Sequence, residues 1–262
     1  MKPLISKDLK KQLNSRLQNV EVSNHHCKKC GRDYELHRFP DGYEFKLGCD
    51  CKIIEACIEA EKKREEQKKA DKINAIYERS IVNPQLERAT FGTYNTKDQE
   101  SLETALRVCK RYAFNFNMDN PQSLLLKGPF GTGKSHLAIS IAKVIKDKGY
   151  TALFMNVPQL ITVIQDTYNR NNSDSELEII KLIQQVDLLV LDDVGVHLSR
   201  NGMAKLFEIM EGRSGRHNIY TTNLTQQELT QDKDWQRLYS RMKAAFPVEV
   251  VGEDHRNWRV QG

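Results

Sequence analysis

Residues 128–138 read GPFGTGKSHLA, and no other stretch constrains the fold of this chain as strongly. Its first eight residues fit G-x-x-x-x-G-K-[ST], a glycine-rich loop that holds phosphate groups. The apolar run SLLLKG (123–128) leads into the loop, and residues 135–149 follow it with apolar side chains at helical spacing. A strand, a phosphate loop and a helix in this order predict a nucleotide site in an α/β domain.

Different positions of the loop are expected to make different contacts. Glycines let backbone N–H groups turn toward phosphates, and the start of the following helix adds its positive dipole end. We expect Lys134 to reach the β- and γ-phosphates and Ser135 to hold Mg²⁺. The residues expected to contact ATP are Gly128, Pro129, Phe130, Gly131, Thr132, Gly133, Lys134, Ser135 and His136. The alternative is a glycine turn before a helix that binds no nucleotide.

A second apolar run, LLVLDD at 188–193, ends in two acids. A strand that ends there places Asp192 at the carboxyl edge of the sheet beside the loop, where we expect it to bind Mg²⁺ directly or through water. Asp193 is then the candidate to polarise the attacking water. The alternative for both acids is a turn or a helix cap.

Strand-like and helical stretches alternate from about residue 85 onward. The expected strands after the loop are 151–157, 187–194, 218–223 and 246–252. This alternation predicts a mostly parallel sheet covered by helices on both faces. With 262 residues and 39% hydrophobic content, the chain can form one full domain and a small additional module.

Four of the six cysteines form two close pairs, Cys27-x-x-Cys30 and Cys49-x-Cys51. Four thiolates on two tight turns can close a tetrahedral Zn²⁺ site, and Asp41-Gly42 between them favours a hairpin. Such a short module buries too little apolar surface to fold without metal. Unliganded thiols are the alternative, and the possible substitute ligands are His25, His26, His37 and Cys57.

The remaining segments predict connections rather than chemistry. Residues 1–24 have the apolar spacing of a short amphipathic helix, and residues 52–80 predict a solvated helical connector without a role beyond spacing. We therefore expect three regions: 1–51 (helix and zinc module), 52–84 (linker) and 85–262 (nucleotide-binding domain). No stretch of about 18 apolar residues is present, so we expect a cytoplasmic protein without membrane contact. The net charge of +5 permits nucleic-acid binding but does not indicate it.

The motifs GPFGTGKSHLA, DLLVLDDVG and IYTTNLT have the order and spacing of the AAA+ ATPases. Within that family, residues 85–262 resemble the DnaC/DnaI-type loaders of the replicative helicase, and the cysteine module is similar to that of phage and Gram-positive relatives. The resemblance implies an AAA+ core of parallel sheet flanked by helices. Because the sequence ends six residues after Arg256, we expect no C-terminal lid domain.

The resemblance also implies a function. It is the ATP-dependent loading of a hexameric replicative helicase onto single-stranded DNA, with the zinc module docking on the helicase and the ATPase domains self-associating. Where many related ATPases carry glutamate, this chain has the shorter Asp193, so we expect slow hydrolysis that a partner stimulates.

Three further residues receive roles only through this resemblance. Asn223 matches the sensor that contacts the γ-phosphate or orients water, although an asparagine there can also cap the next turn. Arg241, or failing that Arg237, matches the arginine presented to the nucleotide of a neighbouring subunit, for which a planar, permanently charged group is suited. Arg256 matches the arginine that closes the nucleotide site.

Residues 157–185 can form two helices broken near residues 169–175. In the resembling ATPases such an insertion contacts single-stranded DNA, here through Tyr168 and Arg170, although a plain surface connection explains the sequence equally well. Two alternative functions remain: an IstB-type transposition ATPase, and a nucleotide-gated helicase adaptor without significant hydrolysis. A DnaA-class initiator is disfavoured because no helix-turn-helix DNA reader follows residue 262.

Overall fold

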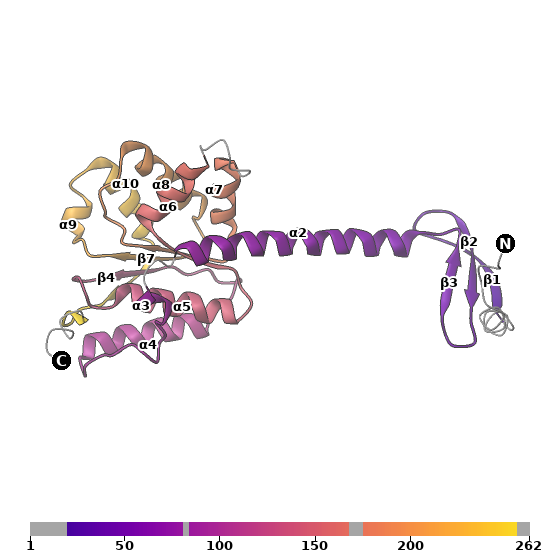
Figure 1. Cartoon of the computed structure of the whole chain (residues 1–262), viewed down its shortest axis with the longest axis horizontal. Coiled ribbons are helices and arrows are strands. Elements are labelled where there is room, and N and C mark those ends of the chain that lie inside the picture. The colour runs from indigo at the N-terminus through magenta and orange to yellow at the C-terminus, as the bar shows by residue number, and fades with distance from the viewer. Residues whose placement is uncertain (1–19, 81–83, 168–174, 256–262) are drawn as a thin grey trace, which may run out of the picture. The chain divides into compact units, whose positions relative to one another are not determined.

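The computed structural model describes residues 20–80, 84–167 and 175–255 (Figure 1). The chain forms two compact units, which divide between Lys68 and Lys69. The amphipathic helix expected near the N-terminus falls mainly outside the described residues. No helix in the described ranges is both long enough and apolar enough to cross a membrane.

The first unit contains a small antiparallel sheet of order β1-β2-β3. Its strands are β1 (Glu21–His26), β2 (Asp33–Arg38) and β3 (Glu44–Leu47). The hairpin predicted at Asp41-Gly42 is confirmed, since β2 and β3 pair across it and Gly42 has the positive φ (+83°) that such turns require. The two turns at the other end of this sheet carry the paired cysteines.

A single helix of 30 residues, α2 (Cys51–Ser80), confirms the predicted helical connector. Most of its described side chains are exposed, as expected for a solvated helix. Its last turns differ from the expectation, because Ile73 and Tyr77 are buried in the core of the second unit. Lys146 lies over the Tyr77 ring, 3.7 Å from its centroid. The end of α2 is therefore part of the second unit's packing and is not only a spacer.

The second unit continues with four more strands and a fifth at its end, separated by helices. In chain order its elements are α3 (Pro84–Glu87), α4 (Glu100–Phe114), β4 (Leu124–Lys127), α5 (Lys134–Asp147), β5 (Ala152–Asn156), α6 (Val157–Asp166), α7 (Glu176–Gln185), β6 (Leu188–Asp192), α8 (Arg200–Gly212), β7 (His217–Thr222), α9 (Gln226–Leu229), α10 (Lys233–Met242) and β8 (Phe246–Glu249). All four strands predicted after the phosphate loop are present.

The five strands form one parallel sheet of order β5-β6-β7-β4-β8. Figure 1 shows α3, α4 and α5 on one face and α6, α7, α8 and α10 on the other. Every residue of β6 is buried, as expected for a strand covered on both faces. The predicted parallel sheet between two helical layers is therefore confirmed.

The strand order decides where a ligand can bind. The chain leaves β4 for the distant β5, whereas β7 lies directly beside β4. Ligands of open parallel sheets bind at such a switch point, beyond the carboxyl ends of the strands. The loop after β4 opens at this point.

Candidate nucleotide site and cysteine cluster

The phosphate loop joins β4 to α5, as the sequence predicts. Gly131 (φ +76°) and Gly133 (φ +84°) adopt left-handed conformations that favour glycine. At Gly133 a Cβ atom would also lie 2.5 Å from Cε2 of Tyr94. The Lys134 side chain is buried, and its Nζ donates a hydrogen bond of 2.6 Å to the Pro129 carbonyl. In this structure the loop lysine, the first residue of α5, is therefore hydrogen-bonded to the loop backbone.

The structure brings Asp192 to this loop. The carboxylate is buried at the end of β6, where it accepts a hydrogen bond from Thr221 Oγ1 (2.7 Å) and lies near enough to the Ser135 hydroxyl for that group to lower its pKa. Burial raises the pKa of Asp192 to about 6, opposed by those two hydroxyls and by the charge of Lys134. A hydroxyl and a carboxylate near one another are oxygen ligands of the kind that Mg²⁺ prefers, so Ser135 and Asp192 fit the ion.

Asp193 is held in an unusual position next to Asp192. Its backbone is left-handed (φ +57°), and its N–H donates to Thr221 Oγ1 at 2.9 Å. Its two carboxylate oxygens accept from Asn223 Nδ2 and from Asn156 Nδ2, each at 3.3 Å. Asn223, which the resemblance assigns to the sensor position, thus contacts Asp193 directly, and its role toward a γ-phosphate or a water stays a prediction.

Asn156 was not identified from the sequence. It ends β5, which lies beside β6 in the sheet. A signal was present, since the apolar run ALFMN ends in asparagine just as the IYTTN run ends in Asn223. Its meaning depends on the strand order, which the sequence did not supply.

A group of aromatic rings lies beside the loop and was also missed. Tyr94 donates from its hydroxyl to the Thr132 carbonyl at 2.8 Å, and its ring centroid lies 5.4 Å from that of His136 and 5.7 Å from that of His255. The backbone N–H of His255 donates to the Gly131 carbonyl at 2.9 Å. These rings pack against one side of the loop and help to hold its backbone in place.

His136 was expected to contact the nucleotide. Its Nε2 bonds to the Thr90 carbonyl at 2.8 Å and to Thr93 Oγ1 at 3.2 Å. Burial lowers the pKa of His136, against the bond to Thr90. Arg256, the other residue expected on this side, lies outside the described residues, as do Tyr168 and Arg170.

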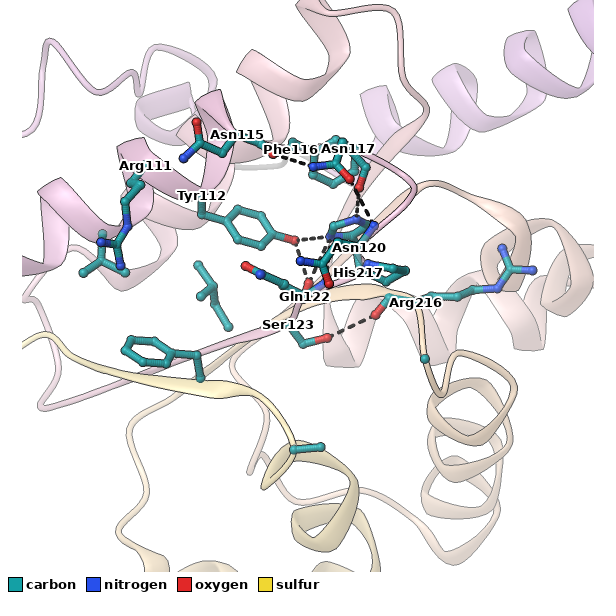
Figure 2. A pocket seen from close by; sticks show the side chains of 16 residues that line it. Arg111, Tyr112, Asn115, Phe116, Asn117, Asn120, Gln122, Ser123, Arg216 and His217 are labelled. Carbon is teal, nitrogen blue, oxygen red and sulfur yellow. Dashed lines mark hydrogen bonds between the residues drawn. The ribbon is translucent and has the colours of Figure 1, made fainter.

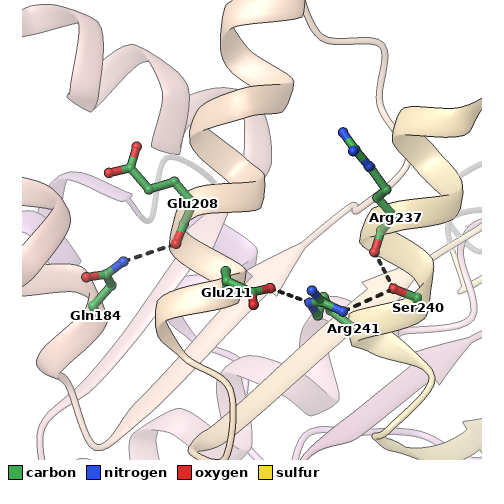
Figure 3. A network of polar contacts seen from close by, with 6 residues as sticks. All are labelled: Gln184, Glu208, Glu211, Arg237, Ser240 and Arg241. Carbon is green, nitrogen blue, oxygen red and sulfur yellow. Dashed lines mark hydrogen bonds and ion pairs between the residues drawn. The ribbon is translucent and has the colours of Figure 1, made fainter.

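Arg241 lies in the last turn of α10 and pairs with Glu211 of α8 (Figure 3). Its guanidinium also lies 5.5 Å from the centroid of the Phe207 ring. Arg237 lies one turn earlier, and its side chain points away from this pair. The arginine expected to act on a neighbouring subunit is thus held within its own chain by an acid.

The four predicted zinc ligands form one cluster in the first unit. The Sγ atoms of Cys27, Cys30, Cys49 and Cys51 all lie within 4.8 Å of one another. The Sγ–Sγ distance is 3.9 Å for Cys27–Cys51 and 3.8 Å for Cys30–Cys49. Tetrahedral thiolates at a Zn–S distance of about 2.3 Å lie about 3.8 Å apart. The donor set and its spacing therefore fit zinc.

The surroundings of the cluster bear on this assignment. Backbone N–H groups of Cys30 and Lys29 lower the pKa of Cys27 to about 6, whereas the neighbouring thiols and burial raise the pKa of Cys51 to about 12, so the assignment to zinc rests on the spacing of the four sulfur atoms. The substitute ligands are not needed, since the three histidines have other partners: His25 bonds to Ser23, His26 to Asp33 and His37 to Glu35. Cys57 is exposed on α2 and is not part of the cluster.

Known proteins are similar to this chain in sequence and in fold. Residues 50–242 match the model of the family described as "IstB-like ATP binding protein". The replicative helicase loader DnaC of Escherichia coli K12 is 29% identical over 190 residues, covering 71% of this chain and 76% of that protein. The replicative helicase loader DnaI of Bacillus subtilis 168 is 23% identical and covers 72% and 60%. A crystal structure of DnaI superposes with a TM-score of 0.56 at 22% identity, covering 67% of this chain and 95% of that one, which shows a shared AAA+ fold.

Proposed function

The chain belongs to the family of IstB-like ATP binding proteins, and from this we propose that it is an ATP-dependent loader, which places a hexameric replicative helicase on single-stranded DNA during replication initiation. The observation that carries the proposal is the similarity to proteins named replicative helicase loader over 71% of the chain. The IstB-type transposition ATPase remains the alternative, and the helicase test below separates the two.

The nucleotide site supports the ATP-dependent part. Lys134 would neutralise the β- and γ-phosphates, while Ser135 and Asp192 would hold Mg²⁺, which supplies further positive charge at the phosphate oxygens. Asp193 would accept hydrogen bonding from the attacking water and orient it. Asn156 and Asn223 would set the direction of that carboxylate, since both already donate to it.

We expect hydrolysis to be slow until a partner binds. The short Asp193 side chain is held toward Asn156 and Asn223 by one hydrogen bond on each carboxylate oxygen, and its reach toward an attacking water is shorter than that of a glutamate. The Lys134→Ala variant should lose ATP turnover, because the site then lacks its main phosphate cation. Steady-state turnover as fast as that of a motor ATPase, without any partner, would contradict the slow cycle. Turnover that is absent from the wild type even with helicase would favour an adaptor without hydrolysis.

Self-association would complete the site through Arg241. The pair with Glu211 would then be exchanged for phosphate oxygens of a neighbouring subunit, where a charge spread over a planar group stabilises the transition state. Arg241→Ala should assemble normally and lose its stimulated ATPase, and Arg237→Ala on the same helix is the matched control. Full stimulation in the Arg241 variant would assign the role elsewhere.

The cysteine cluster would bind zinc and present the first unit to the helicase. A metal held by four thiolates has no open position for catalysis, so a structural and docking role follows. The decisive experiment is co-purification with a hexameric replicative helicase, repeated with Cys27→Ser and Cys30→Ser together and with Cys57→Ser as the control. We expect the intact chain and the Cys57→Ser variant to form the complex, and the variant with both Cys27→Ser and Cys30→Ser to lose it. Absence of any complex with the intact chain would reject the loader function.

A further inference from the structure

A second concave site lies where the strands of the large sheet begin, at the opposite end of the strands from the phosphate loop. It has a volume of about 710 Å³, within the range of about 300–1,000 Å³ typical of ligand pockets. Leu124, His217 and Phe246, the first residues of β4, β7 and β8, all line it. Because the strands are parallel, this edge is separate from the edge that holds Lys134 and Asp192. The nucleotide does not account for this pocket.

The lining has a consistent charge. Of the sixteen residues that line the pocket, two are arginines, Arg111 and Arg216, and none is aspartate or glutamate. Asp119 belongs to the same loop as part of the lining but does not line the pocket itself. In the described part of the chain neither guanidinium makes an ion pair or a side-chain hydrogen bond. Figure 2 shows the two side chains extending to opposite sides of the lining. Two separated, uncompensated cations suit a ligand with more than one negative charge.

The uncharged part of the lining suits planar polar groups. The side-chain amides of Asn115, Asn120 and Gln122 make no hydrogen bond within the described residues, so their donors and acceptors are available to a ligand. The Phe246 side chain is also 56% exposed, and its ring lies at the pocket. Amide groups can pair with base edges and an exposed ring can stack on a base. An acidic peptide would also use the arginines and the amides, but it has no base to stack on the exposed Phe246 ring.

The floor of the pocket is rigid before any ligand binds. The backbone N–H of Gln122 can only donate, so Nδ1 of His217 accepts at 3.2 Å, and Nε2 donates to the Asn117 carbonyl at 2.8 Å. The Tyr112 hydroxyl donates to the Gln122 carbonyl at 3.0 Å, and the Phe116 ring lies 4.1 Å from the His217 ring. These contacts fix the loop between α4 and β4 against β7 (Figure 2). A preformed pocket lowers the ordering cost of binding.

We propose that this pocket binds single-stranded nucleic acid, with Arg111 and Arg216 on phosphates and Phe246 stacked on a base. The inference rests on the proposed loading function and adds to it a DNA contact on the sheet edge opposite the ATP site. It is distinct from any contact made by the segment between α6 and α7.

The test is the equilibrium binding of fluorescein-labelled oligothymidylate to the full chain, followed by anisotropy over a salt series. The variants are Arg111→Ala, Arg216→Ala, their combination and Phe246→Ala. Lys110→Ala is the matched control, since it removes the same charge one residue away on α4 without touching the lining. Thermal unfolding of each variant checks that it is folded.

Each arginine variant should reduce the slope of log K against log salt by about 0.7, the value for one lost phosphate contact on a single strand. Phe246→Ala should weaken binding about tenfold with an unchanged slope, because stacking is not ionic. Lys110→Ala should change Kd by less than about twofold.

Three outcomes would overturn the inference. If the double arginine variant binds oligothymidylate with the wild-type Kd and slope, the pocket is not a nucleic-acid site, and the proposed loader function is unaffected. If the binding of a labelled polyglutamate peptide requires both arginines and the binding of oligothymidylate does not, the pocket is a site for an acidic protein instead. If the wild type forms the helicase complex but binds no oligothymidylate, both the inference and the DNA part of the proposed function fail, and helicase docking stands.

Discussion

Asp193 adopts a backbone conformation that its own side chain disfavours. A left-handed φ of +57° costs a non-glycine residue about 1–2 kcal/mol. The hydrogen bonds from Asn156 and Asn223 to its carboxylate, and from its N–H to Thr221, offset that cost. The direction of the carboxylate is therefore set by neighbouring strands, which is the arrangement expected where strain is stored at a functional residue.

Removing one of these neighbours should affect turnover more than binding. In Asn156→Ala, Asp193 loses a hydrogen bond to a charged acceptor, worth about 1.5–3 kcal/mol. We expect helicase-stimulated kcat to fall by about tenfold or more with the KM for ATP nearly unchanged, because Asn156 orients Asp193 and does not contact the phosphate loop. Steady-state kinetics measure both constants. Equal effects on KM and kcat would show that Asn156 acts on nucleotide binding instead.

The phosphate loop, Asp192 and Asp193 were predictable because their signals are local. A glycine pattern between a strand and a helix, and acids directly after an apolar run, can be identified without knowing any other part of the fold. Asn156 was not predictable in this way, since an asparagine after a strand has no meaning until β5 is placed beside β6. The Tyr94 ring was missed for the same reason, as it reaches the loop from a segment with no regular structure.

The ends of several elements meet at one buried arginine. Arg213, directly after α8, is fully buried, and its guanidinium donates to Asn218 Oδ1 and to backbone carbonyls that include those of Gln184, Val186 and His217. Burial lowers the pKa of Arg213 to about 10, still well above neutral pH. The cation thus caps the end of α7 and joins the starts of β6 and β7.

Arg213→Ala should destabilise the second unit by about 3–5 kcal/mol, because it leaves a cavity and several buried carbonyls without donors. Urea unfolding measures the free-energy difference. Arg216→Ala, three residues away and exposed, is the control and should change stability by less than about 0.5 kcal/mol. A similar small effect in both variants would show that water replaces the guanidinium.

The loop between α4 and β4 should make stability depend on pH through His217. Burial lowers the pKa of His217, so the folded chain binds its proton less readily than the unfolded chain does. The contribution of His217 to the free energy of unfolding is complete above the ordinary histidine pKa of 6.5 and is lost as pH falls below that value. For one group, the free energy of unfolding changes by at most about 1.4 kcal/mol per pH unit.

Urea unfolding at pH 7.5 and 5.5 measures this dependence. His217→Gln should lessen the loss of stability on acidification, and His197→Gln, at an exposed position, should leave it unchanged. Part of the wild-type dependence should remain in the His217 variant, because burial also lowers the pKa values of His136 and His255. An unaltered pH dependence of stability in His217→Gln would show that His217 does not contribute to it.

The order and type of the long helices and strands could be predicted from the sequence. For α2 the helix itself was predictable, but the burial of its last turns was not. Its charged composition correctly predicted a helix exposed along most of its length. Ile73 and Tyr77 are buried because they meet the core of the second unit, a contact that helical propensity does not encode. Arg213 is a parallel case, since a charged residue after a helix normally stays in solvent.

The two units of the chain should respond differently to loss of metal. The sheet of the first unit is small and most of its side chains are exposed, so its stability depends on the cluster, while the second unit has its own core. A strong zinc chelator should remove about one zinc ion per chain and unfold β1–β3. ATP binding by the second unit should persist.

Hydrogen exchange of the full chain, read separately for residues 20–50 and 84–167, tests this prediction. Cys27→Ser should reproduce the effect of the chelator on the first range, and the exposed Cys57→Ser should not. Unchanged protection in the first range after complete zinc removal would mean that the small sheet holds itself together.

Cys51 belongs to two structures at once, since it is a thiol of the cluster and the first residue of α2. The base of the helix is therefore joined to the cysteine cluster through one of its own residues. At about 1.5 Å per residue, a helix of 30 residues is about 45 Å long. A change in the spacing of the four thiols would therefore change the direction of the first turn of α2, because one residue belongs to both.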